Sequence, residues 1–406
     1  MPLQKKKVNS TIKRDKTILI IINMLMQMIF VFYSIYFSIY VYGISGEINF
    51  VLACNLFQII CNLLIQYIIT PWLNKKTYNV FYRMSFILVL ISISLIFTIK
   101  SETLYMVFVV EMFYSFSVIC YYVPHEIVIM NKNSSNQMKS FLGLSTSVAM
   151  ISSFLAPFIS GYIIDFISYY HLFLILTVLS ISCFIFSFFI KNDYVNTRKM
   201  KIGSFIKQAM PIKSLRYSYI SFGFYKISQE SAVSVLLPIL LFLQVHTNFS
   251  VGLYSALASF VSAITLLLYV RFVKKKYTAF ILCSISIVLS ATILVFLPSI
   301  ATFFVYYFVC KICGQILING VNENIFSATK GTVFDKYKKE HHFTFSLSNY
   351  IFQSIGCGLA FLIYNFMRNA SSIIVIVLLL NSLIFMSNYF LIKSDKVKKP
   401  TSISKI

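Results

Sequence analysis

The sequence is poor in charge, and acidic residues are especially scarce. Only 12% of the 406 residues are charged, with 12 Asp and Glu against 35 Lys and Arg. Soluble proteins carry about 25% charged and about 45–50% apolar residues, whereas this chain is 58% hydrophobic with a mean hydropathy of +0.81. These values exclude an ordinary water-soluble domain and favour a lipid bilayer as the solvent.

The sequence also lacks the patterns of an enzyme, a nucleotide-driven pump or a metal site. It has no Walker A loop, HExxH or GxSxG motif and no metal-ligand cluster. All eight cysteines fall in apolar stretches, so no disulfide framework follows, and the CxxC pair Cys310 and Cys313 is more typical of small packing residues. We therefore expect no enzymatic activity, cofactor or metal. Any transport would draw its energy from a gradient.

Apolar runs of membrane-spanning length recur along the chain, since a bilayer core needs about 20 mostly apolar residues per helix. The predicted spans are 17–41, 48–70, 79–99, 103–129, 140–164, 169–190, 217–243, 249–272, 277–298, 300–327, 342–365 and 371–392. The first run is too long for a cleavable signal peptide. The predicted fold class is an all-α polytopic membrane protein of about twelve transmembrane helices.

The basic residues alternate between loops. If the N-terminus is cytoplasmic, 31 of the 35 Lys and Arg fall in cytoplasmic segments, and the outer loops hold only Lys100 and Arg368. One missed helix would exchange inside and outside for every later loop and destroy this asymmetry. Such clustering fits topology signals better than a nucleic-acid partner. The sequence predicts a multi-pass protein of the cell (plasma) membrane with both termini cytoplasmic.

A basic linker, 191–216, divides the chain into two predicted six-helix bundles, 1–190 and 217–406. The halves resemble each other at an offset near 200 residues: Leu73-Asn74-Lys75-Lys76 follows the second span and Val273-Lys274-Lys275-Lys276 follows the eighth. Parallel six-helix halves are a recognised plan of transporters.

The linker itself contains apolar residues at helical spacing among lysines. These residues are Ile202, Phe205, Ile206 and Met210. The spacing predicts a short helix in the membrane interface, and an ordinary solvated linker is an equal alternative.

The fifth span carries small residues around a proline, in the pattern Ser152-x-x-x-Ala156-Pro157-x-x-Ser160-Gly161. This pattern resembles the GxxxGPxxGG antiporter motif of the major facilitator superfamily, and the twelve spans, basic linker and repeat extend the resemblance over the whole chain. Small residues let helices approach closely, and proline bends a helix. The resemblance implies two six-helix bundles around a central cavity that opens to alternate sides, and an exporter.

The chain departs from the family pattern at three places. Asn74, followed by Lys75, stands where the GxxxDRxGRR loop after the second span has an Asp, and Ser115 replaces an Arg of the fourth span. The first span has no acid, since Asn23 and Gln27 are its most polar side chains. The coupling residues therefore cannot be carried over from family positions. Asn74 and Lys75 are predicted as cytoplasmic-end contacts.

Charged residues inside spans are the candidates for substrate binding or proton coupling, because a charge at the bilayer centre costs about 2.5–3.5 kcal/mol. Lys226 and Glu230 share a face of the seventh span at i,i+4 spacing. They either form an ion pair that only locks packing, or line the cavity and bind substrate or a proton. Glu111 and Lys311 lie in equivalent spans and are hypothesised to bridge a gate. Snorkelling of Glu111 to the outer surface is the alternative.

Two further groups complete the predicted sites. Glu126 and Glu323, near the cytoplasmic ends of the fourth and tenth spans, are predicted gate contacts. An aromatic face at i, i+3, i+4, i+7 spacing in the first span consists of Tyr33, Tyr36, Phe37 and Tyr40. Such a face can bind flat apolar or cationic molecules, although packing against lipid is more typical.

The sequence thus predicts a monomeric secondary active transporter that works by alternating access. The leading hypothesis is proton-coupled export of small amphipathic or drug-like molecules. An uptake symporter for a small polar or anionic nutrient and a non-transporting membrane sensor or partner remain as alternatives. The expected partners are the lipid bilayer, a small-molecule substrate and protons, with no nucleic acid.

Overall fold

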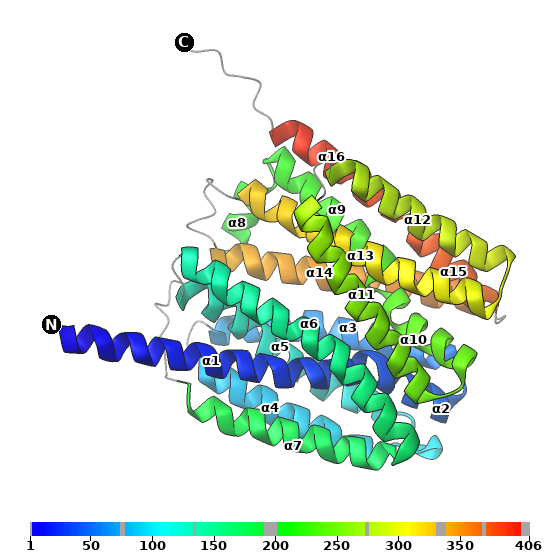
Figure 1. Cartoon of the computed structure of the whole chain (residues 1–406), viewed down its shortest axis with the longest axis horizontal. Helices are drawn as coiled ribbons and strands as arrows, with labels where there is room; N and C mark the ends of the chain where they lie inside the picture. The colour runs from blue at the N-terminus through cyan, green and yellow to red at the C-terminus, as the bar shows by residue number, and fades with distance from the viewer. Residues whose placement is uncertain are drawn as a thin grey trace, which may run out of the picture. The chain divides into compact units, whose positions relative to one another are not determined.

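A computed structural model describes residues 2–73, 78–132, 135–190, 201–272, 276–329, 338–367 and 371–398. All regular structure in these ranges is helical (Figure 1). Among the described residues, twelve helical segments are long and apolar enough to cross a membrane, which confirms the predicted number and fold class. Their composition explains the fold, because only a helix satisfies every backbone hydrogen bond inside its own segment within lipid.

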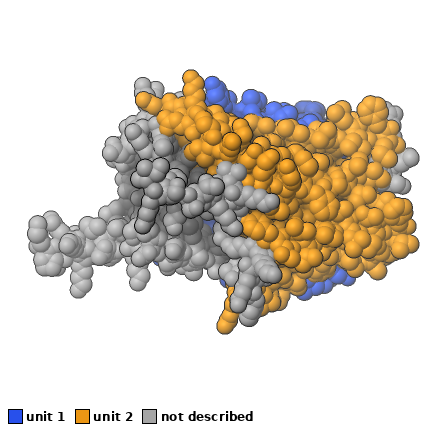
Figure 2. Space-filling model, turned by 90° about the horizontal axis from the view of Figure 1, so that it is seen from above, with its two compact units in different colours: residues 1–199, 245–257 blue, residues 200–244, 258–406 orange. Residues whose placement is uncertain are grey.

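The chain divides into two compact units (Figure 2). The first unit contains residues 1–199 and 245–257, and the second contains residues 200–244 and 258–406. The helices of the first unit are α1 (Pro2–Phe32), η1 (Tyr33–Phe37), α2 (Ser38–Ser45), α3 (Ile48–Leu73), α4 (Tyr78–Ile96), η2 (Ser101–Thr103), α5 (Met106–Lys132), α6 (Ser135–Phe166), α7 (Tyr169–Phe188) and the start of α11 (Asn248–Phe272). Those of the second unit are α8 (Ile202–Ala209), α9 (Lys213–Gln229), α10 (Ala232–Val245), the rest of α11, α12 (Lys276–Phe296), α13 (Ile300–Thr329), α14 (Lys338–Met367), α15 (Ser371–Ser382) and α16 (Ile384–Lys398).

Small polar residues hold the helices of the first unit together. Helix α4 packs on α5 and α7, and α1 packs on α6 and α7. Between α4 and α5, Ser85 Oγ donates to the Ser117 carbonyl at 2.9 Å, and both side chains are fully buried. Small side chains permit this approach, and their hydroxyls remain hydrogen-bonded where no water is present.

The first span differs from the continuous α-helix expected. Its middle, Tyr33–Phe37, forms the π-helix η1 between α1 and α2. Three aromatic residues of this turn, Tyr33, Tyr36 and Phe37, are buried in the first unit. A π-turn rotates the residues that follow it around the helix axis, so the aromatic face no longer follows simple i, i+3, i+4, i+7 geometry.

In the second unit, α9 is the central helix and packs on α13, α14 and α16. Serine pairs again join neighbours, because Ser221 Oγ donates to the Ser387 carbonyl at 2.8 Å and Ser387 Oγ donates to the Ser221 carbonyl at 2.8 Å. The short helix predicted in the linker is present as α8, with Phe205 and Ala209 buried against Leu215.

Candidate functional site

The seventh span is broken in its middle. Residues 230–231 are not helical and separate α9 from α10, although the whole segment Lys213–Val245 is one span. Glu230 has φ of −115° and ψ of 9°, outside helical values, while its N–H still bonds to the Lys226 carbonyl at 3.2 Å. A broken membrane helix is tolerated where it lines a cavity or is buried in protein, and transporters place binding sites at such breaks.

Serine side chains account for the break better than glycine or proline, since neither stands at residues 228–234. Ser228 Oγ donates to the Tyr225 carbonyl at 3.0 Å and Ser231 Oγ donates to the Ile227 carbonyl at 2.5 Å. Ser234 Oγ donates to the Ser231 carbonyl at 2.8 Å. Hydroxyls that bond to carbonyls one turn back compete with the backbone ladder and bend a helix.

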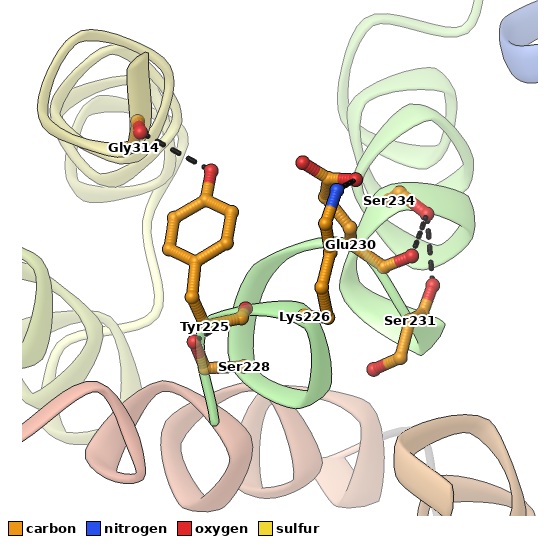
Figure 3. Close-up of polar contacts among 7 residues, drawn as sticks. All are labelled: Tyr225, Lys226, Ser228, Glu230, Ser231, Ser234 and Gly314. Carbon is orange, nitrogen blue, oxygen red and sulfur yellow. Dashed lines mark hydrogen bonds and ion pairs between the residues drawn. The ribbon is translucent and has the colours of Figure 1, made fainter. Parts of the chain in front are cut away.

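The two charged residues in the middle of this span, Lys226 and Glu230, meet at the break. Lys226 Nζ donates to Glu230 Oε2, and Figure 3 shows the amino group directed at the carboxylate. The side chain of Lys226 is only 10% exposed, whereas that of Glu230 is 35% exposed. Lys226 Nζ also lies 5.1 Å from the centroid of the Phe222 ring, a cation–π distance. The predicted i,i+4 pair is therefore formed, with its acid on the more accessible side.

Neighbouring helices approach the break through glycines. Tyr225 Oη donates to the Gly314 carbonyl of α13 at 3.1 Å, on the other side of α9 from the ion pair (Figure 3). A methyl group on Gly356 of α14 would clash with the Ser231 hydroxyl and the Ile227 carbonyl. The missing side chain of Gly356 therefore lets α14 contact the irregular backbone directly.

A buried chain of polar side chains extends from the break. Gln229 Nε2 donates to Asn381 Oδ1, and Asn381 Nδ2 donates to Tyr306 Oη at 2.6 Å. Cys310 Sγ donates to Gln229 Oε1 at 3.1 Å. Asn381 and Tyr306 are fully buried. Sequence reasoning missed this network, because its members are uncharged and 152 residues separate Gln229 from Asn381.

We expect Asn381→Leu to destabilise the protein strongly. Leucine has a similar volume, but it leaves the Gln229 amide without an acceptor and the Tyr306 hydroxyl without its donor. Each unsatisfied group lowers the free energy of unfolding by about 1–3 kcal/mol. The apparent midpoint of thermal unfolding in detergent should fall by roughly 5 °C or more. Ser382→Ala, one residue away on an exposed position, is the control and should change little. Equal midpoints for both variants would contradict the network's structural role.

Glu111 is a buried acid of the first unit. Glu111 lies in α5 and is only 6% exposed, and its Oε2 atom has no hydrogen-bond partner among the described residues. Tyr33 and Tyr114 stack close by in the same unit, with ring centroids 3.7 Å apart. Lys311 belongs to the second unit, where it is exposed and its Nζ lies 5.8 Å from the Tyr307 ring. Because the two residues belong to different units, the bridge between them stays a prediction.

The small-residue pattern of α6 packs against the start of α11 within the first unit. Tyr36 Oη donates to the Pro157 carbonyl at 2.6 Å and also lies 3.4 Å from the Asn248 carbonyl oxygen. A methyl group on Gly161 would clash with the Asn248 carbonyl, and one on Gly252 would clash with the Pro157 carbonyl. The absence of side chains at both glycines therefore allows the two backbones to meet around the Tyr36 hydroxyl.

The other small residues of the pattern, Ser152, Ala156 and Ser160, are also buried. Asp165, at the end of α6, accepts hydrogen bonds from Asn248 Nδ2 at 2.9 Å and from the Phe249 N–H at 2.7 Å. A carboxylate at a helix N-terminus is favoured by the free N–H groups and the helix dipole. Asp165 thus caps α11, a role that sequence reasoning missed.

Comparison with known proteins decides the family. The family model described as Major Facilitator Superfamily matches residues 127–361, more than half of the chain. The chain belongs to the Major Facilitator Superfamily. A crystal structure of a point mutant of the nucleoside transporter NupG has a TM-score of 0.69 at 10% identity and covers 94% of this chain and 99% of its own.

A second similar structure agrees in fold. A bacterial homologue of the iron transporter ferroportin, in an outward-facing state with soaked iron, gives a TM-score of 0.65 at 13% identity, with 94% of this chain and 99% of that chain covered. At such low identity the likeness concerns the fold alone. No curated protein matches the sequence.

In this superfamily member, the outcome differs between the remaining groups of predicted residues. Lys226 and Glu230 meet at the broken span. The predicted aromatic face is largely buried, with Tyr33, Tyr36 and Phe37 in the core and Tyr40 beside Tyr169 at a ring distance of 5.1 Å, so its cavity role stays a prediction. The cytoplasmic-end residues lie outside the described side chains: Asn74, Lys75, Glu126 and Glu323. No group of described His, Cys, Asp and Glu could hold a metal ion.

Proposed function

We propose that this member of the Major Facilitator Superfamily is a secondary active transporter that works by alternating access and exports small amphipathic or drug-like molecules in exchange for protons. The observation that carries the proposal is the ion pair of Lys226 and Glu230 at the break of the seventh span. A carboxylate held near mid-span by a partly buried lysine is costly in lipid and is retained where it binds an ion or a substrate.

The chemistry of this pair suits an exchange cycle. Protonation of Glu230 removes its negative charge and releases Lys226 from the pair, which leaves the irregular backbone at residues 230–231 free to rearrange. A cationic or amphipathic substrate that approaches the 35% exposed carboxylate competes with the proton for the same oxygen atoms. Mutual exclusion of proton and substrate is the requirement for antiport, because each ligand then favours a different state of the carrier.

The remaining site residues receive roles in the same proposal. Glu111 and Lys311 form a charged gate between opposite states, and Glu126, Glu323, Asn74 and Lys75 make contacts at the cytoplasmic ends. The bundles are 1–190 and 217–406, joined by the linker 191–216, and both termini lie in the cytoplasm at the plasma membrane. The distribution of Lys and Arg among the loops supports this orientation.

A specific observation favours a second candidate, uptake of a small polar solute. The amide groups of Gln229 and Asn381 and the hydroxyl of Tyr306 form a hydrogen-bonded chain next to the break, and Lys311 offers an exposed cation. Such groups recognise polar or anionic solutes better than amphipathic cations. One structure of similar fold is that of a nucleoside transporter, which is a carrier of polar solutes by its name.

Inside-out membrane vesicles containing the protein test the two proposals together. We expect the lipophilic cation ethidium to accumulate in vesicles that are acid inside, and accumulation to stop when a protonophore collapses the gradient. Accumulation that survives the protonophore would contradict antiport. Uptake of radiolabelled nucleosides by whole cells, without ethidium export, would favour the symporter. A Glu230→Gln variant with full biological activity and no transport of either probe would favour a membrane sensor.

A further inference from the structure

An apolar groove lies outside the broken span, where the linker helix α8 meets the membrane helices of the second unit. It has a volume of about 260 Å³ and lies between α8, α9 and α14. Its walls include Phe205 and Ala209 of α8, Met210 directly after α8, and Ile351 and Phe352 of α14. Helix α8 packs on α14 in the same unit (Figure 1). The volume lies just below that of pockets for whole drug-like ligands, about 300–1,000 Å³, and suits part of one alkyl chain.

The rim of the groove combines apolar and basic residues. Met210 and Ile351 are large hydrophobic residues that are 57% and 41% exposed, so the groove opens to an apolar surface. Arg216 lines the groove and is exposed. Lysines 201, 207 and 213 are exposed along the same segment.

Acidic residues are missing from this stretch, since residues 201–220 contain three lysines and one arginine but no Asp or Glu. The acid of α14 nearby, Glu340, is buried and accepts a hydrogen bond from the Lys201 N–H at 3.2 Å. Basic residues on an amphipathic helix at the membrane surface attract anionic lipids, and each residue contributes about 1 kcal/mol of binding free energy.

Two hydroxyl groups in the groove wall are unpaired within the described part of the chain. Tyr219 Oη and Thr344 Oγ1 are buried atoms without a hydrogen-bond partner among those residues, and both side chains line the groove. Buried polar atoms are almost always hydrogen-bonded, so an unsatisfied one calls for an explanation. Both oxygen atoms are covered in this structure, and a shift of either side chain would bring its hydroxyl to the ester or phosphate oxygens of an amphiphile in the groove.

We propose that this groove binds one anionic phospholipid. An acyl chain enters between α8 and α14 past Met210 and Ile351. Arg216, assisted by Lys213, pairs with the phosphate group. The side chains of Tyr219 and Thr344 shift on binding, so that their hydroxyls donate to the oxygens near the glycerol. A bound lipid would fix the linker helix α8 against α9 and α14, and this role is independent of the substrate and of proton coupling.

Photo-crosslinking of a diazirine-labelled phosphatidylglycerol to the purified full chain in detergent tests the proposal. We expect labelled peptides to contain Met210 or residues 351–352, and unlabelled phosphatidylglycerol to compete at least threefold better than phosphatidylcholine. Arg216→Gln should reduce groove labelling at least threefold. Arg271→Gln, the same change at another exposed arginine of the second unit, should leave it unchanged.

A change in groove volume separates lipid binding from simple surface attraction. Ala209→Trp or Ser348→Leu should abolish groove labelling, and elution as a single species in size-exclusion chromatography shows which of the two remains folded. The proposal would be overturned if phosphatidylcholine competed as well as phosphatidylglycerol, or if glycerol phosphate without acyl chains did so. It would also be overturned if labelling persisted in a folded groove-filling variant. Labels found only outside the groove would do the same.

Discussion

Glu230→Gln is expected to lower proton-driven net transport of the substrate by about 100-fold or more, while substrate exchange without a gradient continues. Glutamine has the shape of a protonated glutamate, so the variant mimics one fixed protonation state and cannot release a proton in each cycle. The physical basis is the position of the carboxylate, one-third exposed and paired with Lys226 at a break in a membrane span. Initial rates of net accumulation and of equilibrium exchange in proteoliposomes measure the two activities separately.

Controls distinguish coupling from a purely structural ion pair. Removing one partner of a partly buried pair leaves a lone charge and costs up to about 3–5 kcal/mol, so the double variant Lys226→Gln, Glu230→Gln and the swap Lys226→Glu, Glu230→Lys are included. A double Gln variant that keeps both stability and net transport would show that the pair only locks packing, because it has no carboxylate to carry the proton. Glu47→Gln, at an exposed acid between α2 and α3, is the matched control and should keep normal transport.

Gly252→Leu is expected to produce a large loss of stability in the first unit. A side chain at this position meets the Pro157 carbonyl and the Tyr36 hydroxyl, and a backbone carbonyl cannot move aside as a flexible side chain would. Overpacking costs about 1–3 kcal/mol, and loss of the bond from Tyr36 to Pro157 leaves a buried carbonyl at a further cost of about 1–3 kcal/mol. The apparent unfolding midpoint in detergent should fall by roughly 10 °C.

Two other variants locate the cause of that loss. Tyr36→Phe removes only the hydroxyl and should reproduce about half of the effect. Gly43→Leu changes an exposed glycine of α2 where an added Cβ would meet no atom within 4 Å, so its midpoint should stay within about 2 °C of the native protein. If Gly252→Leu and Gly43→Leu unfold at the same temperature, the close approach of α6 and α11 does not support the fold.

The number and order of the membrane helices could be predicted because they follow from composition and length. Apolar runs of about 20 residues and the alternation of basic loops are local signals that no tertiary contact overrides. The internal shape of single spans was not predicted. The π-turn at Tyr33–Phe37 depends on how the aromatic rings pack, and the break after Gln229 depends on serine hydroxyls that bond to backbone carbonyls. Neither feature has a proline or glycine to mark it.

The candidate site could be predicted only where charge marks it. The pairing of Lys226 and Glu230 follows from helical spacing in an apolar span, where an isolated charge would be costly. The network of Gln229, Asn381 and Tyr306 could not be found in this way, because amides and phenols are common in spans and their pairing joins distant helices. The cap that Asp165 provides for α11 likewise needs the packing of the helices to bring its partners together.

Accessibility of the broken span to water is the most direct test of its role. Ser234 follows the break and is exposed near mid-span, whereas Ser382 is exposed on a face of the last span shared with Leu379 and Phe385. In a background with all eight native cysteines replaced, single cysteines at these two positions would be treated with a membrane-impermeant thiol reagent in right-side-out and inside-out vesicles. We predict that Ser234→Cys reacts from both sides of the membrane and that Ser382→Cys, facing lipid, reacts from neither. If Ser234→Cys is unreactive, or reacts from one side only, the break does not line an alternating-access pathway.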